Sequence, residues 1–297
     1  MKRAFIAALV LLAVAPAQAA TKFPVPLVAL TAVAPTLTSN FTGGDEVSQI
    51  LTASTGIFLI GTLESASSTL VTTPSLGGSD GFVTALDSRG TKLWELRLGT
   101  TGDDVATAGH LDPLGNIWIT GSSAISVSGA TSVPGLNRLT IWEVSAAGLL
   151  ENTFAKDLTD IDIPTSISPK GPNFIIEGVS NKVGFPTFSL SLTASGVIGS
   201  IKSRVSAPII SPKIFSITSA AYLWQSFVTT KAIKGVVGVP LHQSMNLLLK
   251  LAIKGKTLKG AYSIQGAPIA LRYQPGVGVV VLSQGAGTYF LTVVHTK

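Results

Sequence analysis

The sequence predicts an all-β protein, and we expect a β-propeller of about five four-stranded blades. Only 12% of the residues are charged and 46% are hydrophobic. Gly, Ser, Thr and Val are abundant, and such a composition favours strands and turns over helices. No segment beyond the N-terminal region has a sustained helical apolar stripe. Two kinds of strand–turn–strand unit alternate along the chain, and two such hairpins together make one propeller blade.

The N-terminus has the pattern of a secretory signal peptide. Lys2 and Arg3 precede a short apolar run. Pro16 is followed at 17–19 by the small-x-small pattern of a signal-peptidase cleavage site. The apolar run is shorter than the roughly 20 residues that a membrane-spanning helix needs. We therefore expect residues 1–20 to be cleaved and residues 21–297 to form one domain, secreted or on the cell-envelope exterior, with no transmembrane segment after cleavage. An uncleaved membrane anchor is the alternative.

The chain contains no cysteine. The expected fold therefore has no disulfide, although export would allow one. The hydrophobic core must hold the domain together by itself. A domain of this length buries roughly 75% of the surface of its unfolded chain, which is sufficient.

The first hairpin type has a glycine in its turn. Its clearest copies are residues 82–99, 139–158, 188–203 and 247–263, with turn residues Gly90, Gly148, Gly196 and Gly255. An N-terminal copy spans residues 27–41 and has Ala34 in place of the glycine. The regular recurrence indicates a repeat architecture.

A second hairpin type alternates with the first. Its turns contain Gly56, Gly115 and Gly171, with a weaker copy near Ala220 and a last copy at Pro275-Gly276. Residues 112–115 read Asp-Pro-Leu-Gly, which favours a turn because proline pre-sets φ and glycine accepts a positive φ. Residues 117–120 then alternate between two faces, as a strand requires.

The chain opens with a hairpin of the first type and nearly ends with one of the second type. Pairing these N-terminal and C-terminal hairpins would complete a fifth blade, close the ring and hide the sheet edges. The strand at 289–295 is surplus to this scheme. A β-sandwich or a β-solenoid with similar spacing is the alternative architecture.

Residues 79–123 resemble the bacterial secreted β-propeller repeat, or SBBP repeat. The matching residues are Asp80-Gly81-Phe82-Val83, Leu86-Asp87-Ser88 with Gly90, Trp94, Leu98-Gly99, Gly102-Asp103-Asp104, Asp112 with Gly115-Asn116, and Thr120-Gly121. The similarity is partial over residues 43–62 and faint after about residue 181. Trp94 has no counterpart in the later hairpins. The resemblance implies an extracytoplasmic propeller and no reaction, because the recurring residues look architectural.

Carboxylates recur at the entry to successive hairpins of the second type. The set is Asp45, Asp104 and Asp160, each 11 residues before a turn glycine, with Glu46, Asp103 and Asp162 beside them. Equivalent positions in successive blades fall on one face of a ring, so an arc of carboxylates could bind a cation or a basic ligand. The alternative is that each aspartate accepts hydrogen bonds from backbone N–H groups in its own inter-blade turn.

The sequence contains no P-loop and no dinucleotide fingerprint. His110, His242 and His295 are solitary, without a second ligand at a metal-binding spacing. We therefore expect a non-enzymatic protein without a cofactor. A propeller-type polysaccharide hydrolase using Asp45, Asp104 and Asp160 is the alternative, since such enzymes generally need two carboxylates flanking the scissile bond.

Charge is divided between the two parts of the chain. All 15 acidic residues occur at or before Glu177, whereas 12 of the 21 basic residues follow it. The candidates for binding a polyanion are Lys231, Lys234, Lys250, Lys254, Lys256 and Lys259. In a ring of blades, this division would make one sector basic and another acidic.

A basic sector on a secreted protein suggests an anionic partner. We expect a binding or scaffold protein that contacts anionic cell-wall or polysaccharide polymers of the cell envelope. Nucleic acid is disfavoured, because the basic part has few aromatic residues for stacking. One alternative is a self-assembling surface subunit whose acidic and basic sectors meet head to tail. A solvated basic face without a partner is the other.

Overall fold

The protein is described by a computed structural model. It covers residues 27–40, 45–64, 68–124, 138–158, 162–180, 187–203, 215–219, 221–238, 243–254, 257–274, 276–285 and 288–295. Within these ranges the chain is all-β, as predicted, with twenty-two strands in five sheets. A search of the same ranges finds no helix long and apolar enough to cross a membrane. The candidate signal peptide at 1–20 lies outside the described residues.

Three sheets are antiparallel and four-stranded, and each is built from consecutive strands. Sheet 1 contains β3 (Glu46–Ala53), β4 (Gly56–Leu63), β5 (Asp80–Leu86) and β6 (Lys92–Leu98). Sheet 2 contains β7 (Asp104–Leu111), β8 (Ile117–Ser123), β9 (Arg138–Val144) and β10 (Leu150–Asp157). Sheet 3 contains β11 (Asp162–Lys170), β12 (Asn173–Ser180), β13 (Thr187–Leu192) and β14 (Lys202–Ser203). Each sheet thus joins one hairpin of each predicted type.

The two remaining sheets include strands from the N-terminus. Sheet 4 contains β15 (Phe215–Thr218), β16 (Tyr222–Thr229), β18 (Met245–Ala252) and β19 (Leu258–Ser263), extended by β1 (Val28–Ala32) and β17 (Val236–Val237). Sheet 5 contains β20 (Ala267–Gln274), β21 (Gly278–Gly285), β22 (Thr288–His295) and β2 (Leu37–Asn40). Strand β1 runs parallel to β19 and to β17.

The N-terminal segment does not form the predicted hairpin. Its two strands enter different sheets, and Leu37 of β2 pairs antiparallel with Leu291 of β22. The surplus strand therefore has a place as β22, the third strand of sheet 5. The expected pairing of the two ends of the chain is present, but through single strands rather than hairpins. This arrangement covers the edges that β19 and β22 would otherwise expose.

Four hydrophobic clusters lie between successive sheets. In β4, Ile57 and Leu59 pack with residues of sheet 5, whereas Phe58 and Ile60 pack with residues of sheet 2. A third cluster joins sheets 2 and 3, and a fourth joins sheets 4 and 5. The middle strands of sheets 1, 2 and 5 are largely buried on both faces because each of these sheets lies between two neighbours. Burying a large apolar side chain contributes about 1.5–3 kcal/mol, so these clusters hold the sheets together.

The first strands of neighbouring sheets lie side by side along the inner side of the arrangement. The Gly109 N–H of β7 donates to Gln49 Oε1 of β3 at 2.6 Å, and Arg272 Nε of β20 donates to the Ile50 carbonyl of β3 at 3.1 Å. Strand β11 contacts β7, and β15 contacts β20. The sheets are therefore arranged radially, like blades.

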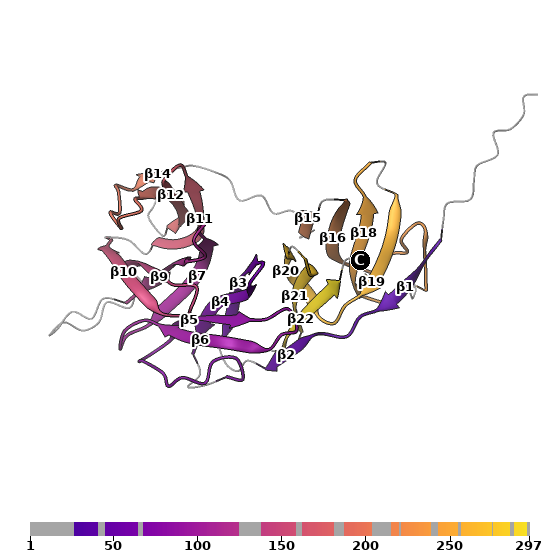
Figure 1. The fold of residues 1–297 in the computed structure, drawn as a ribbon, viewed down its shortest axis with the longest axis horizontal. Helices are drawn as coiled ribbons and strands as arrows, with labels where there is room; N and C mark the ends of the chain where they lie inside the picture. The colour runs from indigo at the N-terminus through magenta and orange to yellow at the C-terminus, as the bar shows by residue number, and fades with distance from the viewer. Residues whose placement is uncertain are drawn as a thin grey trace, which may run out of the picture.

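The five sheets form an arc in the order 4, 5, 1, 2, 3 (Figure 1). Sheet 3 lies at one end of the arc and sheet 4 at the other. Among the described residues, these two end sheets do not share a hydrophobic cluster. The predicted blade architecture is present, but the described residues do not show a closed ring.

Candidate functional site

The carboxylates at the entries to β3, β7 and β11 occupy equivalent positions, with one change from the sequence prediction. Asp104 pairs with Ser123, and Asp162 pairs with Ser180. Ser123 lies two residues after Gly121 in β8, and Ser180 lies two residues after Gly178 in β12, so the two pairs have the same place in their sheets. Asp162 is therefore the counterpart of Asp104. The prediction that Asp160 holds this position was wrong, because the β11–β12 hairpin is two residues shorter on its first strand. Asp160 itself lies outside the described residues.

Three of the predicted carboxylates accept hydrogen bonds from backbone N–H groups. Asp45 Oδ1 accepts from the Glu64 N–H at 2.7 Å, and Asp103 Oδ1 accepts from the Ser79 N–H at 3.0 Å. Asp104 Oδ2 accepts from the N–H and the hydroxyl of Thr100, at 2.7 and 2.9 Å. These bonds fix the connections between strands. The geometry thus favours the turn-stabilising role that the sequence left open.

The aspartates at the equivalent positions are inaccessible to a large ligand. Asp45, Asp104 and Asp162 are all buried, whereas Glu46 and Asp103 are exposed. Burial raises the pKa of Asp104, and the nearby Asp80 carboxylate adds to the increase, although the hydrogen bonds from Thr100 oppose it. A search of the described residues finds no group of three or more His, Cys, Asp or Glu side chains that could hold a metal ion.

A buried ion pair lies next to this part of the structure, within the SBBP-like segment. Arg97 Nη1 donates to Asp80 Oδ2 at 2.6 Å, and both side chains are almost completely buried. Arg97 Nε also donates to the Thr73 carbonyl at 2.8 Å, and the Leu76 N–H donates to Asp80 Oδ2 at 3.1 Å. The pair therefore anchors the 72–79 segment to sheet 1. This role is structural.

The predicted lysines differ in their surroundings. Lys231, Lys234, Lys254 and Lys259 are exposed, and Lys256 lies outside the described residues. Lys250 is half-buried, and its Nζ lies 4.0 Å from the centroid of the Tyr222 ring and 5.3 Å from that of Trp224. A cation over aromatic faces is held by the ring quadrupoles. Lys250 thus packs within sheet 4, whereas the four exposed lysines face solvent.

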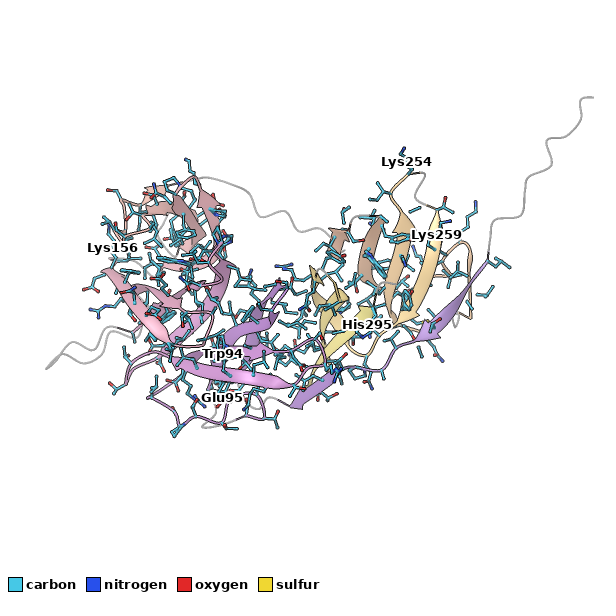
Figure 2. All side chains as sticks on the ribbon, in the orientation of Figure 1. Trp94, Glu95, Lys156, Lys254, Lys259 and His295 are labelled. Carbon is cyan, nitrogen blue, oxygen red and sulfur yellow. The ribbon has the colours of Figure 1, made fainter. Side chains whose placement is uncertain are left out.

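Three exposed lysines gather near one end of sheet 4, where β1 begins. Lys234 precedes Gly235, whose carbonyl accepts a hydrogen bond from the Val28 N–H at 2.7 Å. Lys259 lies two residues before Ala261, which pairs with Leu30 of β1 on its other side. Figure 2 shows Lys254 at the tip of the β18–β19 turn and Lys259 on the same sheet. We call Lys234, Lys254 and Lys259 the lysine cluster.

The fold separates the two signs of charge in space. Sheets 4 and 5 contain no acidic residue, because their strands come either from after Glu177 or from the uncharged segments 28–32 and 37–40. Sheets 1–3 and their connections hold the acidic residues. The charged side chains on the strands of sheets 4 and 5 are therefore all basic, although Asp45 and Glu46 at the start of β3 lie near Tyr289 of sheet 5. Strands β1 and β2 come from the acidic part of the sequence and join sheets 4 and 5, but they contain no charged residue.

A pocket that the sequence did not predict opens beside the β7–β8 turn of sheet 2 and the β11–β12 turn of sheet 3. Its volume is about 510 Å³, and its lining includes His110, Leu114, Pro172, Asn173 and Phe174. The sequence does show the two proline-containing turns that frame the pocket, at 112–115 and 169–172, but it does not show that they lie close together. Their approach depends on how sheet 2 packs against sheet 3. His110 lies in β7 and also lines this pocket.

No protein-family profile matches the sequence, and no curated protein matches it either. Solved structures are similar in fold. The Pan2 WD40 domain of Neurospora crassa is 10% identical, with 85% of this chain and 90% of that chain covered and a TM-score of 0.35. The WD40 β-propeller domain of Doa1 is 8% identical, with coverage of 90% and 98% and a TM-score of 0.43.

A xylan β-1,4-xylosidase from Bacillus halodurans C-125 is 9% identical, with a TM-score of 0.33. The match covers 86% of this chain and 45% of the xylosidase. All three superpositions have low TM-scores, so the assignment of blades rests on the strand pairings and inter-sheet contacts described above. The SBBP resemblance has no counterpart among these comparisons.

Proposed function

We propose that the chain is a non-enzymatic binding or scaffold protein of the cell exterior, exported by its N-terminal segment, that holds an anionic envelope polymer on its cationic sector. The observation behind this proposal is the absence of any acidic residue from sheets 4 and 5. A polymer of phosphate or carboxylate groups meets only basic side chains on the strands of these two sheets.

The lysine cluster is the contact that we propose for the polymer. Lys234, Lys254 and Lys259 are exposed, and neighbouring strands lie about 4.8 Å apart, so cations around the start of β1 are within reach of successive charges on one polymer. Lysine binds phosphate as a mobile point charge and does not require a fixed bidentate geometry. Such a surface suits a repetitive polymer better than a single small anion.

The test is sedimentation of the purified protein with insoluble cell-wall material at low and high salt. Each lysine near an anionic surface contributes about 1 kcal/mol. Replacing the lysine cluster by glutamine should therefore weaken binding roughly 100-fold. Binding should also fall steeply with salt, because ions screen charges over about 8 Å at physiological ionic strength.

The matched control removes three positive charges from the acidic part of the molecule. Lys92→Gln, Lys156→Gln and Lys170→Gln together give the same net charge, but these residues lie on sheets 1–3. Retained binding in this control would assign the effect to the cluster. Equal losses in both triple variants, or no binding at low salt, would refute the proposal. Salt-sensitive oligomers without polymer binding would favour the self-assembling subunit instead.

We further infer that the five sheets close into a ring by packing sheet 3 against sheet 4, as SBBP-type blades would. The support is the radial order of the first strands and the architectural role of Asp80, Arg97 and Asp104 in the SBBP-like segment. The outward faces of sheets 3 and 4 include Ser191 and Gln225, which alternate with core residues of their strands.

Because the chain has no cysteine, a label pair at Ser191→Cys and Gln225→Cys is free of background. Packed sheets lie about 10 Å apart, so a closed ring gives a short distance between the two spin labels. Double electron–electron resonance measures it. A distribution confined to distances several times larger would show an open arc.

A further inference from the structure

The pocket beside the β7–β8 and β11–β12 turns of sheets 2 and 3 has preformed apolar walls. Leu114 is 83% exposed at the tip of the β7–β8 turn, and Pro113 precedes it. Pro172 stands opposite in the β11–β12 turn. Proline rings have few conformations to lose, so a ligand that binds between these turns orders little of the protein. The volume of about 510 Å³ is within the usual range for small-molecule sites.

Two polar side chains in the lining are available to a ligand. Within the part of the chain that the structure describes, neither His110 nor Asn173 has a side-chain hydrogen bond, although both line the pocket. The His110 ring lies against Phe174 in an edge arrangement, with 5.8 Å between centroids. Burial lowers the pKa of His110, with Asp112 opposing the change, so the imidazole is neutral near pH 7. A neutral imidazole both donates and accepts hydrogen bonds.

The charged residue of the lining is already bonded within its own turn. Asp112 Oδ1 accepts from the N–H groups of Leu114 and Asn116, at 2.8 and 2.9 Å. Its Oδ2 accepts from Trp118 Nε1 at 3.3 Å. These bonds engage the Asp112 carboxylate within its own turn, and its negative charge would repel an anionic ligand. The polar groups left to a ligand are the neutral side chains of His110 and Asn173, which match uncharged hydroxyl groups.

We propose that this pocket binds an uncharged ring compound with a flat apolar face and hydroxyl groups at its edge. The apolar face packs between the Pro113–Leu114 and Pro172 walls. The hydroxyl groups hydrogen-bond with His110 and Asn173. A pyranose and a phenol share this chemistry. This ligand site is independent of the lysine cluster, which lies on sheet 4.

The test is saturation-transfer NMR of the purified full chain with two probes, a neutral methyl glucoside and 4-methylphenol. A signal from the glucoside alone identifies a sugar ring, and a signal from the phenol alone identifies an aromatic ring. In either case, Leu114→Asp and Asn173→Leu should each weaken binding at least tenfold. Leu114 lies in the β7–β8 turn and Asn173 is the first residue of β12, beside the β11–β12 turn, so both variants are expected to fold.

The control is Leu149→Asp, which changes another exposed leucine, in the neighbouring β9–β10 turn outside the pocket lining. This variant should bind the probe as the unchanged protein does. The proposal is overturned by the absence of transfer to both probes, or by binding that Leu114→Asp and Asn173→Leu leave unchanged. A loss of equal size in Leu149→Asp would also overturn it.

Discussion

The turn glycine Gly148 of sheet 2 lies directly against the indole ring of Trp94 on sheet 1. A Cβ atom at Gly148 would stand 2.6 Å from Cδ2 of Trp94, and the glycine φ is +83°. The same relationship joins the next two sheets, where a Cβ at Gly196 would be 1.9 Å from Cε1 of Phe154. Each turn therefore rests on an aromatic ring of the preceding sheet. These glycines are needed both for the turn and for the contact between sheets.

Gly148→Ala should destabilise the fold by about 2–5 kcal/mol. The left-handed conformation costs about 1–2 kcal/mol for a residue with a Cβ, and the overlap with Trp94 adds about 1–3 kcal/mol. Urea unfolding measures the change. Gly171→Ala is the matched control, because its φ is +59° and nothing lies within 4 Å of an added Cβ. Equal losses in the two variants would show that the contact with Trp94 contributes nothing.

Arg97→Met should cost about 3–5 kcal/mol, because it leaves the Asp80 carboxylate buried without its cation. The comparison is Arg138→Met, which breaks the exposed pair with Asp157 and should cost less than about 1 kcal/mol. Chemical denaturation of both variants gives the two values. If Arg97→Met proves too unstable to study, the double variant with Asp80→Asn should fold and recover part of the loss. Similar small losses in both single variants would contradict the prediction.

Asp104→Asn should change the pH dependence of stability. The raised pKa of Asp104 means that the folded state binds its proton more tightly than the unfolded state does. The contribution of Asp104 is therefore fully present below the unfolded carboxyl pKa of about 3.9 and is lost as pH rises through the higher folded value. The stability of Asp104→Asn relative to the unchanged protein should rise across that window. Thermal melts from pH 4 to pH 7 would show this trend, and a constant difference would exclude it.

Lys250→Met should lower stability by about 1 kcal/mol and leave polymer binding unchanged. The Lys250 ammonium interacts with the rings of Tyr222 and Trp224, and methionine keeps most of the packing while removing that attraction. Lys254→Met is the complementary variant, because Lys254 is exposed, and it should weaken binding without a change in stability. Denaturation and cell-wall sedimentation of both variants separate the two roles. A loss of polymer binding in Lys250→Met as large as that in Lys254→Met would show that Lys250 also contacts the polymer.

The hairpins were predictable because their signals are local. The period of two in residues 117–120 and the turn at 112–115 specify a strand and its direction change within a few residues. The structure confirms both, and places Ile117 and Ile119 in one inter-sheet cluster and Trp118 in the next. The charge division was also present in the sequence. It became a division in space because the N-terminal strands that join sheets 4 and 5 are uncharged.

Sequence spacing failed where hairpins differ in length. Counting back from Gly171 gave Asp160, but pairing of β11 with β12 puts Asp162 opposite Ser180. The count assumed that every hairpin has the same number of residues on its first strand. Strand register depends instead on which backbone groups pair across the turn and on bulges such as the one between Pro164 and Ser166.

The sequence by itself determined the all-β class, the alternating hairpins, their turns and the concentration of lysine after Glu177, because each follows from residues close together in the chain. Only the tertiary structure decided that β1 joins β19, that β2 joins β22, and that the turns at 112–115 and 169–172 frame one pocket. These relationships join segments far apart in sequence. They are set by the packing of whole sheet faces, which no local pattern records.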